Sequence, residues 1–274
     1  KRNVGLVGFW KMDEDSWDST ANEVIDYSGL GNHGTSYADA TTTSSARYNR
    51  AGEFDGTGDY ISCGSDSSLD MGDGSLTIGT WIKADNVDNY MGIINKSALG
   101  GSLGWGMGIT NGKVRCEIHD GSRAWTEYDT TIEIDTWYYI MAVFDRGDDK
   151  IKVYINGNKE STELDITGKG SITGSNCYIG SLNTSAWIFD GQVDHVKVWK
   201  RALTTKEISE EYVTGPAPVA YWSMDQIDGT TVVDQSGMGN DCTMDGGVTK
   251  NNNWKPGKVG QALSFKDDAD AHLD

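Results

Sequence analysis

Short stretches in which apolar and polar residues alternate recur along most of the chain. Strict alternation indicates a β-strand, because successive side chains of a strand point to opposite faces. A further stretch, Trp137 to Phe144, has apolar residues on both faces and is typical of a central strand. Many such strands predict an all-β, antiparallel, two-sheet sandwich. The clearest alternating stretches are residues 75–83, 113–119, 150–156 and 192–199.

A single segment near the end of the strand-rich part predicts a helix. Thr204 offers a cap and Glu207 stands at capping-box spacing from it. Apolar residues follow at helical spacing, at Ile208 and Tyr212. We therefore expect one short helix at the C-terminal end of the sandwich.

A proline-containing linker follows this helix. Gly215-Pro216-Ala217-Pro218 holds two of the three prolines of the chain and predicts a domain boundary, with one domain over 1–215 and a remainder over 216–274. Beyond it, Phe9–Asp13 (FWKMD) is echoed by Tyr221–Asp225 (YWSMD), and Asp26–His33 by Asp234–Asp241. We interpret 216–274 as the linker and the truncated N-terminal part of a second copy. The partial copy is too short to close a sandwich by itself. It could fold alone, pack on the first domain or swap with another chain.

The charge and composition of the chain exclude several classes of function. The 274 residues contain 41 acidic and 23 basic side chains, a net charge of -18. Nucleic acid and anionic membranes are therefore not expected as partners, since both require clustered cations. The longest apolar run is too short to insert into a bilayer. The four cysteines, at 63, 116, 177 and 242, lack zinc-site or redox spacing, but could form one or two disulfides. The start at Lys1, without Met, suggests an excerpt of a longer, processed polypeptide.

Seven blocks follow one another in a fixed order: GFWKMDE, DYSGLGNHG, GEFDGTGDYI, SLTIGTWIKAD, DTWYYIMAVFD, VYINGN and FDGQVDHVKVWKRALTTKEISEEY. This ordered series resembles a known family, the laminin-G-like jelly roll of the concanavalin A-like type (LamG-3 or pentraxin-like). The resemblance covers roughly 4–213 fully and 218–274 in part. It implies two antiparallel sheets, one of them concave, in an accessory module of secreted or cell-surface proteins that bind glycans or proteins. It also implies that a structural Ca²⁺ ties the loop after the first strand to the last strand.

Four oxygen-bearing side chains are candidate calcium ligands. Asp13 follows the first strand, Asp26 and Asn32 lie in a Gly-rich turn, and Asp194 lies on the last strand. Ca²⁺ takes six to eight oxygen ligands, and the first and last strands of a jelly roll are commonly close. The alternative is that Asp26 and Asn32 only shape Asx-turns.

Four aromatic residues in polar or loop-like contexts are candidate sugar-binding groups. They are Trp17, Tyr90, Trp125 and Trp187, with Arg123 as a polar companion. Exposed indole and phenol rings offer flat apolar faces with a polar edge, which suit the apolar face of a sugar ring. The alternative for each ring is partial burial under a loop.

No catalytic motif stands out. Glu133-Ile134-Asp135 begins like the acid motif of laminarinase-type enzymes, but Tyr138 occupies the position of the third acid. The sequence therefore predicts a non-catalytic, calcium-stabilised carbohydrate-binding module, extracellular, with a polysaccharide or glycan as partner. The alternative is an adhesion or spacer module for surface proteins in a tandem array. A glycoside hydrolase or polysaccharide lyase domain is the least favoured reading.

Overall fold

The computed structural model describes residues 3–96, 104–184 and 187–214, and then 222, 231–232, 242–243, 254–256 and 261–263. The chain divides into two compact units, Lys1–Val213 and Thr214–Asp274. Each unit is described by itself.

An eight-stranded antiparallel sheet forms one layer of the first unit. Its order is β13-β12-β11-β6-β15-β4-β3, and β1 pairs with β15 as well. The alternating stretches 75–83, 150–156 and 192–199 supply three of its strands, as predicted. The strands are β1 (Leu6–Trp10), β3 (Thr41–Thr43), β4 (Ala51–Asp55), β6 (Leu76–Ala84), β11 (Trp137–Asp145), β12 (Lys150–Ile155), β13 (Asn158–Asp165) and β15 (Asp190–Trp199).

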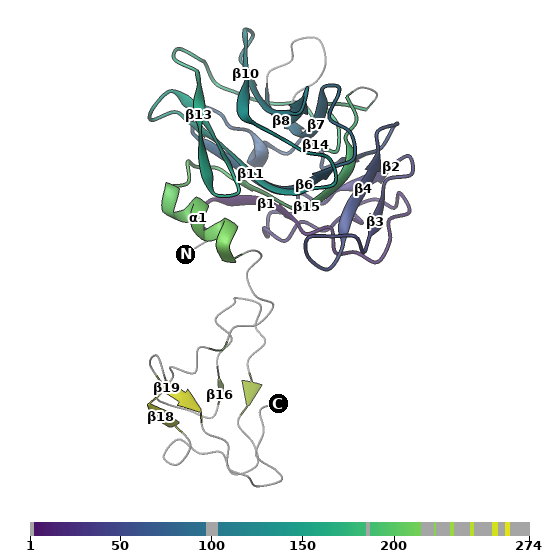
Figure 1. The fold of residues 1–274 in the computed structure, drawn as a ribbon, viewed down its shortest axis with the longest axis vertical. Coiled ribbons are helices and arrows are strands. Elements are labelled where there is room, and N and C mark those ends of the chain that lie inside the picture. Colours follow the sequence, from purple (N-terminus) through teal and green to yellow (C-terminus); the bar gives the residue numbers. More distant parts are fainter. Residues whose placement is uncertain are drawn as a thin grey trace. The chain divides into compact units, whose positions relative to one another are not determined.

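A seven-stranded antiparallel sheet forms the other layer, in the order β10-β9-β8-β7-β14-β5-β2. The two sheets face one another, with β7, β8, β10 and β14 above β6, β11 and β15 in Figure 1. This arrangement confirms the predicted two-sheet sandwich. The strands are β2 (Thr35–Tyr37), β5 (Tyr60–Ser62), β7 (Met91–Lys96), β8 (Gly104–Thr110), β9 (Lys113–His119), β10 (Arg123–Thr131) and β14 (Tyr178–Ile179), and a 3-10 turn, η1 (Ser67–Leu69), precedes β6.

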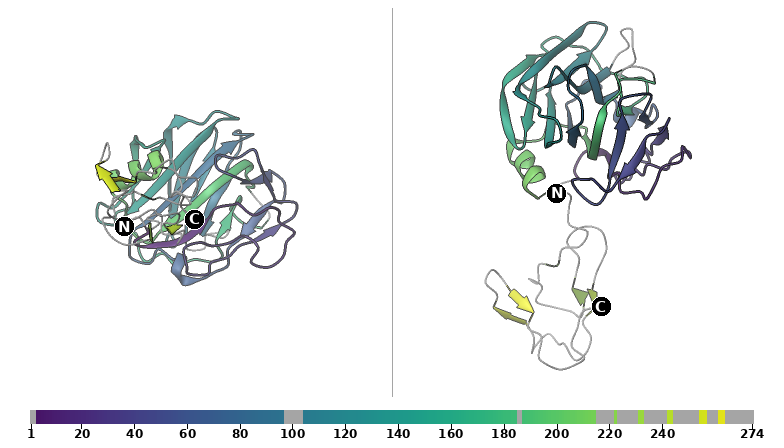
Figure 2. Two further views of the ribbon diagram at one scale, coloured as in Figure 1. Left: turned by 90° about the horizontal axis from the view of Figure 1, so that it is seen from below. Right: turned by 45° about the vertical axis from the view of Figure 1, so that its right-hand side comes forward.

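The central strands of the eight-stranded sheet, β6, β11 and β15, are buried on both faces. Its inner face contributes residues such as Trp10, Phe54 and Phe144 to the core between the sheets. Its outer face carries a second apolar cluster, to which α1 (Thr205–Thr214) contributes Ile208. The helix lies beside β11, β13 and β1 in Figure 1 and is seen from other directions in Figure 2. Coverage on both faces explains why 137–144 is apolar at nearly every position.

The helix is fixed at its start by the predicted capping box. The Thr204 Oγ1 atom accepts a hydrogen bond from the backbone N–H of Glu207 (3.3 Å), while the Glu207 carboxylate accepts one from the backbone N–H of Thr204 (2.9 Å). One turn later, the Lys197 ammonium of β15 donates to the Glu211 carboxylate over 2.7 Å. The helix is thus tied to the sheet by apolar contacts and by a largely buried ion pair.

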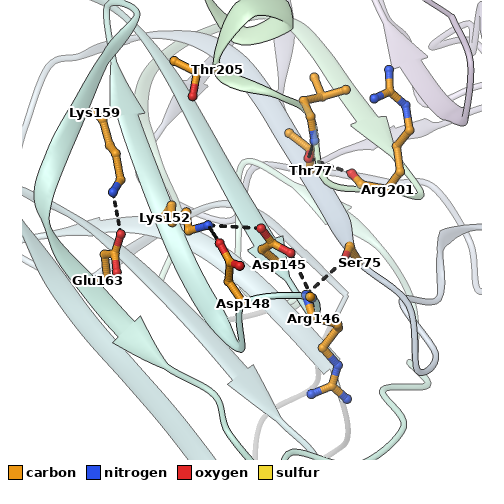
Figure 3. Close-up of polar contacts among 12 residues, drawn as sticks. Ser75, Thr77, Asp145, Arg146, Asp148, Lys152, Lys159, Glu163, Arg201 and Thr205 are labelled. Carbon is orange, nitrogen blue, oxygen red and sulfur yellow. Dashed lines mark hydrogen bonds and ion pairs between the residues drawn. The ribbon is translucent and has the colours of Figure 1, made fainter.

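Polar contacts join side chains on β11, β12 and β13 and in the loop between β11 and β12 (Figure 3). Lys152 donates to Asp145 over 3.1 Å and also to Asp148, and Lys159 pairs with Glu163. These pairs are partly or largely exposed, so we expect each to add little to stability.

The described parts of the second unit are two short strand pairs. β16 (Thr231–Val232) pairs with β17 (Cys242–Thr243), and β18 (Trp254–Pro256) pairs with β19 (Gln261–Leu263). Apart from Trp222, the predicted repeats 221–225 and 234–241 lie outside the described residues. The interpretation of this unit as a partial second copy stays a prediction. Within the described part of the chain, no helix has the length and apolar character needed to cross a bilayer.

Candidate functional site

The outer face of the seven-stranded sheet is defined by alternation along β8 and β9. On β8 (GWGMGIT), every second residue belongs to the core, so the three intervening glycines face outward. On β9, the same alternation turns Arg115 and Glu117 outward. The core residues of the two strands are Trp105, Met107, Ile109, Val114, Cys116 and Ile118.

The outward glycines leave room for the side chains of Tyr90, the residue before β7, and of Asn95, on β7. A Cβ atom added at Gly108 would lie 2.9 Å from Cε2 of Tyr90, and one added at Gly106 would lie 2.1 Å from Oδ1 of Asn95. Both distances are too short for a real contact. The glycines therefore allow Tyr90 and Asn95 to lie flat over β8, next to the β9 side chains.

Four side chains form a continuous arrangement on this face, which we call the aromatic–guanidinium stack: Trp187, Tyr90, Arg115 and Trp125. The ring centroids of Trp187 and Tyr90 are 5.8 Å apart. The Arg115 guanidinium carbon lies 4.4 Å from the Tyr90 ring centroid and 3.9 Å from that of Trp125. The two ends of the stack are open, since Trp125 is 46% and Trp187 41% exposed. Contacts of a guanidinium with aromatic faces hold such an arrangement together by cation–π attraction.

Hydrogen-bonding groups adjoin the stack. The Glu117 carboxylate accepts from the guanidinium of Arg123 and, over 3.3 Å, from that of Arg115. Arg123 remains half-exposed and can offer further N–H groups to a ligand. Burial raises the pKa of the Tyr90 phenol, so its hydroxyl stays a donor at neutral pH. Among the described residues, the Tyr90 hydroxyl and Nε of Arg115 have no hydrogen-bond partner.

The structure thus brings together four of the five residues predicted to bind a ligand, namely Tyr90, Arg123, Trp125 and Trp187. It places Trp17 elsewhere. That indole is only 7% exposed, belongs to the core and donates to Glu14 over 3.2 Å. Its ring fills the space beside Gly52, where an added Cβ atom would lie 2.8 Å from it. Trp17 therefore does not belong to the candidate site.

Two of the four predicted calcium ligands, Asp26 and Asn32, are joined in one hydrogen-bond network. The Asp26 carboxylate accepts from the backbone N–H groups of Phe9, Ser28 and Asn32, at 2.8 to 2.9 Å. The Asn32 amide donates to Ser68 Oγ and to the carbonyl oxygen of Val7, both over 2.8 Å. Backbone donors point at both oxygens of Asp26, as in the Asx-turn alternative.

The other two predicted ligands, Asp13 and Asp194, belong to a second network. Asp13 accepts from the backbone N–H of Arg50 over 3.3 Å, and Asp194 accepts from that of Tyr48 over 2.8 Å and pairs with the His195 imidazole. Burial raises the pKa of Asp194. Asp26 and Asn32 are thus held by one set of protein donors, and Asp13 and Asp194 by backbone donors of residues 48–50. Calcium binding by the domain stays a prediction.

Among the described residues, one group of three acids has side chains close enough to share a metal ion. Single ligand atoms of Asp39, Asp55 and Asp59 all lie within 4.8 Å of one another. The Asp59 carboxylate accepts from the backbone N–H groups of Asp39 and Asp55, both over 3.1 Å. Burial, with the neighbouring Asp55 charge, raises the pKa of Asp59 to about 6. Its hydrogen bonds lie within the group, so the group by itself identifies no ligand.

Comparison with solved structures finds sandwiches of the same kind. The binding domain of Paraclostridial Mosquitocidal Protein 1 superposes with a TM-score of 0.64 and 14% identity, over 82% of this chain and 54% of that one, so this chain spans about half of that domain. The botulinum neurotoxin serotype D ligand binding domain in complex with N-acetylneuraminic acid gives 0.59 and 15%, over 91% and 67%. Domain 4 of AbnA, a GH43 extracellular arabinanase from Geobacillus stearothermophilus, in complex with arabinotriose, gives 0.54 and 15%, over 76% and 98%.

At these identities the structural likeness establishes the fold alone. A search of the curated proteins returned no match. The model of the Laminin_G_3 family, concanavalin A-like lectin/glucanases superfamily, matches residues 55–209, more than half of the chain. That stretch holds the whole seven-stranded sheet except β2 and most of the eight-stranded sheet. The chain therefore belongs to the Laminin_G_3 family of the concanavalin A-like lectin/glucanase superfamily.

Proposed function

We propose that the first unit is a non-catalytic carbohydrate-binding module that holds a glycan on the outer face of its seven-stranded sheet. The observation that carries the proposal is the aromatic–guanidinium stack, with its open ends at Trp125 and Trp187. The stack combines flat apolar rings with fixed hydrogen-bond donors, which is the chemistry that a sugar ring requires.

Each part of the site has a matching part of a sugar. The apolar face of a pyranose or furanose ring stacks on an indole, which contributes through buried area and ring contacts. Guanidinium groups present several N–H donors in a rigid fork that pairs with hydroxyl or carboxylate oxygens. Arg115 is held in position by the two rings and Glu117, so little conformational entropy is lost when a ligand binds.

Two structural relatives support the ligand class. One was solved with N-acetylneuraminic acid, an acidic sugar, and another with arabinotriose, a neutral one. The second relative is a domain of an extracellular enzyme, which fits an accessory module of a secreted or surface protein. We propose the same setting for this chain.

Two sets of acidic residues in the described part of the chain, Glu117 and 133–135, give no support to hydrolysis. On the outer face, Glu117 accepts from two guanidinium groups. The Glu133-Ile134-Asp135 segment lies in the turn before β11, where Glu133 donates its backbone N–H to the Tyr138 hydroxyl over 3.3 Å. A glycosidase requires two free carboxyl groups on either side of a bound glycosidic bond. We therefore assign binding, and not cleavage, to this face.

A glycan array probed with the labelled full chain tests the proposal. We expect a signal on a defined family of glycans and no release of reducing sugar when the corresponding polysaccharide is incubated with the protein. Absence of signal on every glycan, together with saturable binding to a surface-protein preparation, would replace this function with the adhesion alternative. Release of reducing sugar would replace it with hydrolysis.

A further inference from the structure

Two buried cysteines stand opposite one another on neighbouring strands of the seven-stranded sheet. β5 and β14 pair through Ile61 with Ile179 and Ser62 with Tyr178. Continuing that antiparallel register by one residue places Cys63 opposite Cys177. The backbone keeps the two residues adjacent through a slightly irregular register, because the N–H of Cys63 donates to the carbonyl oxygen of Cys177 over 2.9 Å, whereas the N–H of Cys177 donates to that of Gly64 over 2.7 Å.

The distance between these positions suits a disulfide. Residues directly opposite in an antiparallel pair have Cα atoms about 4.5 to 5.5 Å apart, and disulfides join Cα atoms about 4.4 to 6.8 Å apart. The Cys177 thiol contributes to the raised pKa of the Cys63 thiol, as expected for two side chains that lie close together. Both side chains lie in the core, and the described structure records them as free thiols.

We propose that Cys63 and Cys177 are joined by a disulfide when the chain folds in an oxidising compartment. The oxidant is a low-molecular-weight disulfide such as oxidised glutathione. One cysteine thiolate attacks it and releases one glutathione thiolate, and the second cysteine thiolate then attacks the mixed disulfide and releases the other. Two cysteine thiols are thereby oxidised, two electrons reduce the glutathione disulfide, and the two protons end on two glutathione thiols.

The bond forms during folding and not afterwards. Burial raises the pKa of the Cys63 thiol well above its usual range, so the completed sandwich holds little of the thiolate that must attack. Partly folded chains expose both cysteines while the strands are pairing. Once closed, the bond would be shielded from reductants by the core.

The bond would tie two strands that are distant in sequence. It would close a loop of roughly one hundred residues, for which loop-closure entropy gives a large stabilisation. Cys116 lacks such an opportunity, because its neighbours across β8 and β10 are Met107 and Thr126. It therefore serves as an internal control.

Peptide mapping of the full chain tests the inference. The reduced, unfolded protein is refolded with a mixture of reduced and oxidised glutathione, blocked with iodoacetamide in denaturant and digested without reduction. We expect a peptide linking Cys63 to Cys177, carbamidomethylated Cys116, and a melting temperature that falls by about 10 °C on reduction. The Cys116→Ser variant keeps the linked peptide and the shift, whereas Cys63→Ser and Cys177→Ser each lose both.

Two results would overturn the inference. One is alkylation of both Cys63 and Cys177 after oxidative refolding, and the other is linkage of either residue to Cys116 or Cys242. Because the mapping uses the parent chain, it stays decisive even where a serine variant fails to fold. It also requires no sugar, so its outcome is independent of the proposed glycan site.

Discussion

Replacement of Trp125 by alanine removes the more exposed end of the aromatic–guanidinium stack. The indole is 46% exposed. A covered tryptophan buries about 150 to 250 Å², so roughly 100 Å² of this ring is available to a sugar. If a sugar covers between half and all of that area, at about 25 cal/mol per Å², burial contributes roughly 1 to 2.5 kcal/mol. Trp125→Ala should therefore weaken binding about 5- to 70-fold.

Isothermal titration calorimetry with the strongest oligosaccharide found on the array measures this loss. Tyr27→Ala is a matched control, because Tyr27 is 45% exposed but its backbone bonds to Phe9 in β1, on the other sheet. We expect Tyr27→Ala to bind like the parent chain. The reasoning is refuted if Trp125→Ala, shown to be folded by its unfolding curve, binds within twofold of the parent, or if both variants lose binding equally.

Three further predictions concern stability. Lys197→Met leaves the largely buried Glu211 carboxylate without its partner, so the free energy of unfolding measured in urea should fall by about 3 to 5 kcal/mol. The double variant Lys197→Met with Glu211→Leu should recover most of that loss. No recovery would mean that the broken ion pair does not cause the loss. Burial raises the pKa of Asp59 to about 6 in the folded chain, above its usual 3.8, so the folded state binds this proton more tightly than the unfolded state. The stabilisation is therefore full below about pH 4 and is lost as the pH rises through 6. The melting temperature of Asp59→Asn relative to the parent should therefore rise between about pH 4 and pH 7, and a constant difference would refute the shift. If calcium stabilises the domain, chelation should lower the melting temperature and excess Ca²⁺ should restore it. Asp194 already accepts a hydrogen bond from Tyr48 and pairs with His195, so the Asp194→Ala variant should respond to chelation like the parent. A variant that no longer responds to chelation would identify Asp194 as a calcium ligand.

The fold could be predicted from the sequence because the pattern of apolar and polar residues within each strand indicates that strand by itself. The alternation in 113–119 and 150–156 depends only on which face of a strand meets the core. The apolar run at 137–144 indicated a strand buried on both faces. The sequence predicted the helix at 203–212 as well. It did not predict that this helix covers the second face of the sheet, because that depends on tertiary packing.

Only some residues of the candidate site could be predicted from the sequence. Trp17 and Trp125 have similar polar neighbours in sequence, yet the first is buried because Glu14 accepts from its indole and Gly52 leaves space for its ring. Local context contains neither fact. Arg115 was missed although the alternation of β9 turns it outward, because its role depends on Tyr90 lying across the glycines of the neighbouring strand.

For the predicted calcium ligands, too, local sequence does not determine the role of a side chain. Asp and Asn in Gly-rich turns bind metals and shape turns with the same atoms, so spacing does not separate the two roles. In the structure, the direction of the donors at Asp26 is that of the turn role. At Asp26, backbone N–H groups point at the carboxylate oxygens.

The central claim is that a glycan binds across the aromatic–guanidinium stack, and a crystal structure of the full chain soaked with the strongest oligosaccharide from the array tests it most directly. The account predicts a sugar ring stacked on Trp125, with hydroxyl or carboxylate oxygens within hydrogen-bond distance of Arg115 or Arg123. Sugar density at another place on the unit, such as the stacked pair of Tyr37 and Tyr60, with none on Trp125 or Trp187, would contradict it.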